Sequence, residues 1–170
     1  KARTLMALAF VDNCVIDADA LTSFENNPDE LFVDTYPHTI FTPHEGEFRR
    51  LFGDNIASMN DKVLKCVEAS KIAGSIVLLK GSDTVIANPK GEVVINFSKA
   101  PYLATAGSGD VLAGIIASLV GKNKMNSFDA ACAGAWIHSK LGEYLGPGLI
   151  AEDLVDNIPY IIKKLSNYEL

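Results

Sequence analysis

Residues 105–114, Thr-Ala-Gly-Ser-Gly-Asp-Val-Leu-Ala-Gly, have the residue types and spacing best suited to chemistry in this chain. Gly107 and Gly109 let the backbone turn sharply and approach a ligand closely. The residues that follow are apolar, which predicts a helix over 111–120. The N–H groups at a helix start carry partial positive charge and hold phosphate or a developing oxyanion. Asp110 stands at this start, where a carboxylate could take a proton from a hydroxyl while the amides hold a phosphoryl group.

The same stretch also has a plain structural interpretation. Aspartate is a favoured N-cap residue, and glycine-rich turns precede many helices. The spacing matches neither a P-loop nor a dinucleotide fingerprint, because a third glycine is missing and no Gly-Lys-Ser/Thr follows Gly109. Capping and catalysis therefore both stay open for Asp110.

A second turn of interest is the segment 42–47, Thr-Pro-His-Glu-Gly-Glu, which leads from a predicted strand into a predicted helix. His44 could bind a ligand, and Glu47 could bind a hydrated metal ion. The alternative is that His44 is a solvated loop residue and Glu47 an acid that favours the first turn of a helix. The segment alone favours the alternative.

A third turn follows the apolar run 75–80 and contains Lys80, Gly81, Ser82, Asp83 and Thr84. A lysine at the end of a buried strand, followed by glycine, can meet a phosphate. Alternatively, it is a surface lysine whose aliphatic stem covers apolar neighbours.

Two further acids, Asp17 and Asp19, follow the short apolar run 13–17, which predicts another buried strand. They either shape a turn or lie near a ligand.

The elements that must position these turns read as strand, helix, strand, helix, hairpin and paired helices. This order is typical of an α/β sheet with helices on its faces. Strands are predicted at 13–17, 39–42, 75–80, 84–87 and 92–97, with a hairpin turn at 88–91, and helices at 45–52, 60–74, 111–120, 128–145 and 151–165. The three unusual turns fall at corresponding strand ends, which indicates one nucleotide site.

Side-chain patterns give more detailed expectations for three helices. In 60–74 the face Val63, Leu64, Val67 and Ile72 is predicted to be buried, with Lys62, Lys65, Glu68 and Lys71 largely off it. In 128–145 Ser127 is the predicted cap, and the small residues of the first half predict close packing on 111–120. His138 is expected to be a satisfied or exposed helix residue, and Ser139 to face water. Pro159 is expected to break or restart the last helix.

The composition limits the class of protein. The 170 residues suffice for one domain, 1–170, and no internal repeat or second domain is recognisable. The net charge of −6 argues against binding to nucleic acid or an anionic membrane. The widely spaced Cys14, Cys66 and Cys132 favour buried free thiols in a reducing cytoplasm. Residues 1–10 read as the second half of a helix, so we expect the sequence to lack an N-terminal portion.

Several motifs together resemble one family. The sequence of residues 104–114 is similar to the signature of the ribokinase-like superfamily, and more closely to that of the NAD(P)H-hydrate dehydratases. These form the C-terminal domain of the bacterial bifunctional NAD(P)H-hydrate repair enzymes. The other matching segments, in the family's order, are 17–21 (Asp-Ala-Asp-Ala-Leu), 42–47, 77–81 (Val-Leu-Leu-Lys-Gly) and 150–154 (Ile-Ala-Glu-Asp-Leu). The resemblance covers nearly the whole chain and implies a mostly parallel sheet flanked by helices, with an antiparallel hairpin.

The resemblance also implies a reaction. NADH or NADPH damaged by hydration of the nicotinamide ring (NADHX or NADPHX) is restored at the expense of ADP, or of ATP in eukaryotic relatives. Phosphorylating the poor leaving group, a hydroxyl, turns it into phosphate, which the lone pair of the ring nitrogen can expel.

The resemblance assigns roles by motif. Asp110 would be the base on the substrate hydroxyl, and the amides around Gly107, Ser108 and Gly109 would form the anion hole. The nucleotide would contact Lys80, Gly81, Ser82, Asp83, Thr84 and Gly109. His44 and Asp110 would contact the hydrate, and Glu47 would support Mg²⁺. The resemblance further implies a homo-oligomer, with an epimerase domain possible in the full-length protein.

The chain departs from the family pattern in three places. Residues 98–104, Ser-Lys-Ala-Pro-Tyr-Leu-Ala, replace the usual Gly-Asn-Pro-Gly-Met-Ala. His44 stands where the superfamily's Asn-x-x-Glu motif has asparagine. The segment 80–83, Lys-Gly-Ser-Asp, is closer to eukaryotic members, which leaves the choice between ADP and ATP open, with ADP favoured. Two rival functions remain: a kinase of the same superfamily acting on a vitamin-precursor alcohol, and a nucleotide-binding subunit without catalysis.

Overall fold

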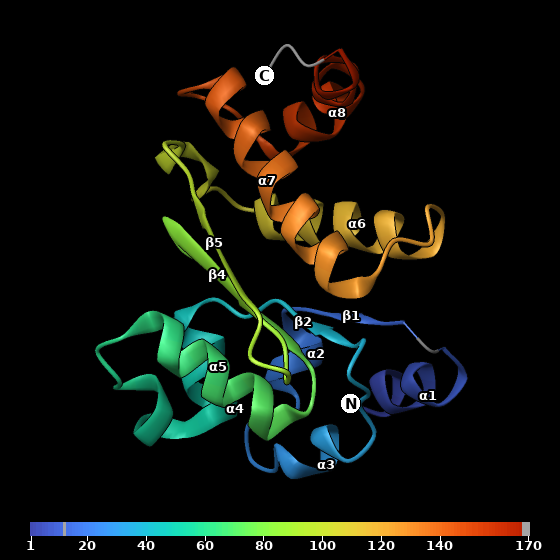
Figure 1. Cartoon of the computed structure of the whole chain (residues 1–170), viewed down its shortest axis with the longest axis vertical. Coiled ribbons are helices and arrows are strands. Elements are labelled where there is room, and N and C mark those ends of the chain that lie inside the picture. Colours follow the sequence, from blue (N-terminus) through green and yellow to red (C-terminus); the bar gives the residue numbers. More distant parts are fainter. Residues whose placement is uncertain (12, 168–170) are drawn as a thin grey trace.

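The computed structural model describes residues 1–11 and 13–167. A five-stranded sheet lies between layers of helices (Figure 1). The helices are α1 (Ala2–Phe10), α2 (Asp19–Thr22), α3 (Asp29–Phe32), α4 (Glu45–Ala57), α5 (Lys62–Ala73), α6 (Ser108–Gly121), α7 (Ser127–Leu145) and α8 (Ala151–Ser166), with a 3-10 helix η1 at Pro101–Leu103. The strands are β1 (Val15–Ile16), β2 (Ile40–Phe41), β3 (Ile76–Leu79), β4 (Asp83–Ala87) and β5 (Val93–Phe97). The predicted α/β class is confirmed.

The sheet is mixed, with the strand order β1-β2-β3-β4-β5. Strands β1, β2 and β3 run parallel, while β4 runs antiparallel to both β3 and β5. The predicted hairpin joins β4 to β5. Its turn is held by Asn88, whose Oδ1 accepts hydrogen bonds from the backbone N–H groups of Lys90 and Glu92. Because β1, β2 and β3 point the same way, their carboxyl ends meet at one edge of the sheet.

Alternating side chains of the strands feed two separate cores. Val77 and Leu79 of β3 point toward the layer that contains α4 and α5, whereas Ile76 and Leu78 point toward α6 and α7. Both faces of the central strand are therefore buried, as its continuous apolar sequence predicted. Figure 1 shows the two layers, with α4 and α5 on one side of the sheet and α6 and α7 on the other.

Helices α6 and α7 pack closely, which confirms the prediction from the small residues of α7. A Cβ atom on Gly134 would lie 2.5 Å from Cγ1 of Ile116, so only glycine fits there without a shift. Helix α8 packs on both through a third core that includes Leu141, Leu154 and Ile161.

The predicted buried face of α5 is partly wrong. Leu64 and Ile72 are 51% and 49% exposed, while Cys66 and Ala69 are fully buried. The helix lies so close to β3 and β4 that small side chains face the sheet and the larger aliphatic ones turn outward. Lys65, expected off this face, is buried because its Nζ binds both carboxylate oxygens of Glu45, at 3.0 and 2.8 Å.

Three expectations for the last two helices are also wrong. Helix α8 continues through Pro159, because Leu154 and Ile161 anchor it on both sides of the proline. Ser139 is buried, and its Oγ accepts a hydrogen bond from Nδ2 of Asn96 at 2.7 Å. Asn126 rather than Ser127 caps α7, since its side chain accepts the N–H of Phe128.

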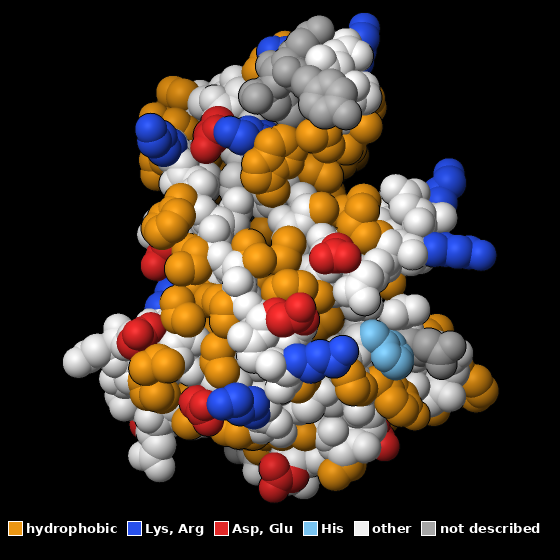
Figure 2. Space-filling model, in the orientation of Figure 1, with side chains coloured by type: hydrophobic (Ala, Val, Ile, Leu, Met, Phe, Trp, Pro, Cys, Tyr) orange, Lys and Arg blue, Asp and Glu red, His pale blue; other side chains and the backbone are white. Residues whose placement is uncertain are grey.

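The surface carries apolar side chains at the end of the molecule where α7 and α8 lie. Figure 2 shows hydrophobic side chains gathered over that upper part. Exposed large hydrophobic residues there are Tyr144, Val155, Tyr160, Ile162 and Leu165. Such a surface is compatible with subunit contact, but the oligomeric state stays a prediction. Within the described ranges no helix is both long and apolar enough to cross a membrane.

We predict opposite effects of two Gly→Ala substitutions. Gly134→Ala should lower the free energy of unfolding by about 1–3 kcal/mol, because the new methyl group overlaps the stiff side chain of Ile116. Gly114→Ala, also inside a helix but with open space at its Cβ, should raise it by roughly 0.5–1 kcal/mol. Urea denaturation of both variants measures this. Equal effects would contradict the close contact between α6 and α7.

Candidate active site

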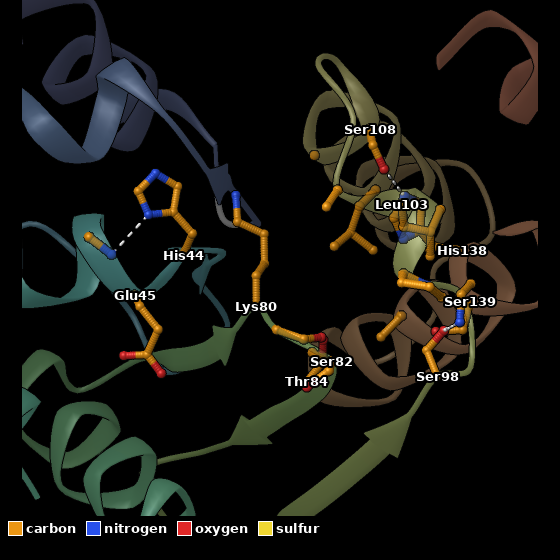
Figure 3. A pocket seen from close by; sticks show the side chains of 18 residues that line it. His44, Glu45, Lys80, Ser82, Thr84, Ser98, Leu103, Ser108, His138 and Ser139 are labelled. Atoms are coloured by element: carbon orange, nitrogen blue, oxygen red, sulfur yellow. Dashed lines mark hydrogen bonds between the residues drawn. The ribbon is translucent and has the colours of Figure 1, made fainter. Parts of the chain in front are cut away.

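A cavity of about 810 Å³ lies where the predicted turns meet. Figure 3 shows His44, Glu45 and Lys80 on one side, Ser108, His138 and Ser139 on the other, and Ser82 and Thr84 between them. The complete lining is His44, Glu45, Gly46, Lys80, Gly81, Ser82, Thr84, Ser98, Ala100, Pro101, Leu103, Ala104, Ser108, Gly109, Leu112, Ala135, His138 and Ser139. The size suits a small organic ligand such as a nucleotide.

The turn from β2 into α4 is fixed by a reciprocal cap. His44 Nδ1 accepts hydrogen bonds from the backbone N–H groups of Gly46 (2.9 Å) and Glu47 (3.2 Å), and Glu47 Oε2 accepts the backbone N–H of His44 (2.8 Å). A Cβ atom on Gly46 would lie 2.9 Å from Cε1 of His44, so a larger residue there would push the ring out of its capping position. Since Nδ1 accepts, a neutral His44 carries its proton on Nε2. The ring is therefore a hydrogen-bond donor at the cavity mouth.

Lys80 connects the ends of all three parallel strands. Its Nζ lies 2.8 Å from Oδ1 of Asp17, after β1, and 3.7 Å from Oε2 of Glu47, after β2. All three side chains are mostly buried, with 20%, 12% and 8% exposure for Lys80, Asp17 and Glu47. A Cβ atom on Gly109 would lie 3.4 Å from the Lys80 ammonium. The ammonium thus stands beside the start of α6, where an anion would meet both.

The start of α6 offers free backbone donors. Gly107 turns the chain with a φ of 81° as the N-cap. In the described chain the backbone N–H groups of Gly109 and Asp110 donate to no protein acceptor. Ser108 is buried, and its Oγ lies 2.9 Å from Nε2 of His138. Asp110 is exposed in the first turn of the helix, next to the cavity lining rather than within it.

The turn between β3 and β4 is held by a side chain of α5. Nζ of Lys62 donates to the backbone oxygen (2.6 Å) and to Oδ1 (2.9 Å) of Asp83. This hydrogen bond lowers the pKa of the Asp83 carboxyl. A Cβ atom on Gly81 would lie 2.5 Å from the same ammonium, so glycine lets Lys62 reach the loop. Asp83 therefore shapes the turn, while Gly81, Ser82 and Thr84 line the cavity.

The residues present suit a hydrated Mg²⁺ rather than a protein cage. No group of three or more His, Cys, Asp or Glu side chains able to hold a metal occurs within residues 1–11 and 13–167. Glu47 already accepts the His44 amide and lies near Lys80. Mg²⁺ commonly keeps several waters and binds through one or two carboxylates plus substrate phosphates. Glu47 and Asp17 can serve such an ion through its water shell.

Most of the site residues named from sequence come together. His44, Lys80, Gly81, Ser82, Thr84, Ser108 and Gly109 line the cavity, whereas Glu47, Asp83, Gly107 and Asp110 lie outside the lining. Asp17 is likewise absent from the lining, and its ion pair with Lys80 places its carboxylate beside the cavity.

Sequence reasoning missed the wall formed by residues 98–104 and by His138 and Ser139 of α7. Gly142, a glycine inside the predicted helix 128–145, was a usable signal of another segment packed closely there. In the structure a Cβ atom at this position would lie 2.5 Å from Cγ of Leu103.

The fold and the cavity define an α/β protein of the ribokinase-like class. A solved ribokinase-like superfamily protein from Enterococcus faecalis V583 superposes with a TM-score of 0.79 at 25% identity, covering 95% of this chain and 57% of that chain. The NAD(P)H-hydrate dehydratase family matches residues 4–163. The chain therefore belongs to the NAD(P)H-hydrate dehydratase family.

Named relatives agree with this assignment. The sequence is 40% identical over 159 residues to the bifunctional NAD(P)H-hydrate repair enzyme Nnr of Moorella thermoacetica, covering 89% of this chain and 29% of that protein. It is 39% identical over 133 residues to the ADP-dependent (S)-NAD(P)H-hydrate dehydratase of Neisseria meningitidis serogroup B, covering 77% and 45%. The ADP/ATP-dependent NAD(P)H-hydrate dehydratase of Bacillus subtilis, co-crystallised with ATP/Mg²⁺ and soaked with CoA, superposes with a TM-score of 0.74 at 26% identity over 89% and 56%. The chain thus spans less than half the length of the relatives from Moorella thermoacetica and Neisseria meningitidis.

We predict that His138 makes the fold sensitive to mild acid. Burial, with a smaller contribution from the nearby charge of Lys80, lowers the pKa of His138 from 6.5 to about 4. Between these two pH values the unfolded chain binds a proton that the folded chain does not, so stability falls as pH drops from 6.5 to 4. The loss due to this residue should be about 3 kcal/mol. Urea denaturation across this pH range should show a shallower dependence in His138→Gln, and an identical dependence would contradict the burial effect.

Proposed function

We propose that this chain carries the nucleotide-dependent dehydratase site that returns hydrated NADH or NADPH to NADH or NADPH. One observation carries the proposal. The Lys80 ammonium lies beside the start of α6, where the backbone N–H groups of Gly109 and Asp110 are free and Asp110 also supplies a carboxylate. A site that only bound anions would gain nothing from a carboxylate there. The names of the relatives from Neisseria meningitidis and Bacillus subtilis support the same reaction and the use of ADP or ATP.

In this proposal the nucleotide phosphates lie against Lys80 and the amides of Gly109 and Asp110. Gly81, Ser82 and Thr84 line the nucleotide side of the cavity, and Asp83 keeps their loop in place through Lys62. Bound Mg²⁺ would neutralise phosphate charge, with Glu47 and Asp17 next to its water shell. The apolar wall, including Leu103 and Leu112, provides surface for the uncharged part of the ligand.

The chemical step uses Asp110 as base. Its carboxylate accepts the proton of the substrate hydroxyl as the oxygen attacks the terminal phosphoryl group of ADP or ATP. The O–P bond forms, the bond to the departing nucleotide phosphate breaks, and the amides of α6 stabilise the charge. The lone pair of the ring nitrogen then expels inorganic phosphate, which leaves an iminium ion. Loss of a proton from the adjacent ring carbon to water restores the ring double bond of NADH or NADPH. His44 orients the hydrate by donating from Nε2, because its Nδ1 is occupied by the helix cap.

Other parts of the assignment belong to the same proposal. We treat residues 1–170 as one ribokinase-like dehydratase domain, in which ADP is the preferred donor because of the Thr-Pro-His-x-Gly-Glu turn. A fused epimerase domain in the full-length protein is supported by the bifunctional relatives. A cytoplasmic setting is supported by the three free thiols. Assembly into a homo-oligomer remains an expectation.

The direct test mixes the full-length protein with NADHX, Mg²⁺ and either ADP or ATP, and follows the NADH absorbance. Recovery with one nucleotide would establish the reaction and its phosphoryl donor. Absence of recovery in a folded protein that still binds nucleotide would overturn the proposal. Accumulation of a phosphorylated alcohol from a vitamin precursor would instead identify a small-molecule kinase.

We predict that Asp110→Asn keeps nucleotide affinity and lowers turnover by about 10²–10⁴, because the general base is lost. Calorimetric binding and the absorbance assay measure the two quantities. Asp129→Asn is the matched control, since Asp129 is an exposed first-turn acid of α7 outside the cavity lining. Near-normal turnover in Asp110→Asn would remove Asp110 from the mechanism.

A further inference from the structure

The cavity contains a side-chain pair that the proposed mechanism does not use. Oγ of Ser108, in the first turn of α6, lies 2.9 Å from Nε2 of His138, on α7 (Figure 3). The two residues are 30 positions apart, and their exposures are only 2% and 9%. Both nevertheless line the cavity, so the pair lies between the protein interior and the ligand space.

The contact is held by the packing of the two helices. Gly134, one turn before His138, lets α7 approach Ile116 of α6 closely. Gly107 fixes the backbone just before Ser108 with its positive φ. The hydroxyl and the imidazole therefore meet through two rigid helices, which is how a precise donor position is maintained.

The chemistry of the surrounding groups decides which way the hydrogen bond should run. A buried imidazole stays neutral at pH 7, so only one of its nitrogens carries a proton. Two neighbouring groups that an anion would meet, the Gly109 amide and the Lys80 ammonium, are donors. If Ser108 gave its proton to His138, it would present only lone pairs to that anion. If His138 donates from Nε2, the proton of Ser108 is free to point into the cavity.

We propose that His138 is a positioning residue that donates from Nε2 to Ser108 Oγ, so that the Ser108 hydroxyl acts as an additional donor to the transferring phosphoryl group. This inference rests on the proposed function, because the anion it serves is the phosphoryl group of that reaction. Ser108 thereby joins the backbone amides of α6 as a side-chain donor. His138 touches no reacting atom and acts through Ser108.

The test compares variants that keep or remove the donor. His138→Leu and Ser108→Ala should each lower kcat by about 10- to 100-fold with KM for the nucleotide within about threefold, because the donor matters most where charge develops in the transition state. The double variant should be no worse than either single one. His138→Gln, which keeps an N–H at this place, should recover most of kcat. Ser70→Ala is the control, since Ser70 is a buried helical serine with two backbone hydrogen bonds outside the cavity lining.

Losses of kcat that multiply in the double variant, a His138→Gln enzyme as slow as His138→Leu, or unchanged kcat would each overturn the proposal.

Thermal denaturation identifies any variant that simply fails to fold. The nitrogen chemical shifts of His138 test the wild-type protein directly. These shifts should show a proton on Nε2 both without ligand and with ADP. A proton on Nδ1 instead would overturn the inference even if wild-type turnover is normal. If the wild-type protein lacks turnover, the proposed function fails, and these shifts still decide the hydrogen-bond direction by themselves.

Discussion

The largely enclosed side chain of Lys80, which is 20% exposed, is the constraint on which the site depends. A charge with so little exposure is stable only when it is paired, and here its partners are carboxylates that follow two other strands. The pairing is possible because β1, β2 and β3 are parallel and end at one edge. The same ion pairs that hold the ends of the three parallel strands together therefore place a cation beside the start of α6.

The second half of the cavity depends on packing rather than charge. The glycine and alanine residues of α7 let α6 come close, and Gly142 lets η1 lie against the same helix. These contacts bring Ser108, His138 and the apolar wall to face Lys80 across the cavity. One wall is thus positioned electrostatically and the other by small side chains. A ligand with a charged end and an apolar body, such as a nucleotide, matches this division.

The sequence predicted the turns of the site better than the long-range contacts that hold them. Residues 42–47, 80–84 and 105–110 could be identified because glycine, proline and capping residues act locally and leave a readable pattern. The hydrogen bond between Ser108 and His138 could not be predicted, because it joins residues 30 positions apart and depends on the packing of two helices.

The wrong predictions for α5 and α8 also arise from tertiary packing that the local sequence does not show. The apolar pattern of α5 suggested that Leu64 and Ile72 are buried, but the short distance to the sheet selects the small face with Cys66 and Ala69. Pro159 is a helix breaker by local preference, yet tertiary contacts on both sides keep α8 continuous. Local rules therefore located the site, whereas burial of individual side chains required the folded arrangement.

The central claim is that Lys80 provides the cation that holds the nucleotide phosphates in this cavity. Calorimetric titration of the full-length protein with ADP, comparing wild type with Lys80→Met, tests it most directly. A second variant, Lys80→Met with Asp17→Asn, removes the carboxylate charge that the first variant leaves without its nearest partner. The account predicts that both variants lose about 10- to 100-fold in affinity, the value of a charged hydrogen bond. Wild-type affinity in a folded Lys80→Met protein would contradict it.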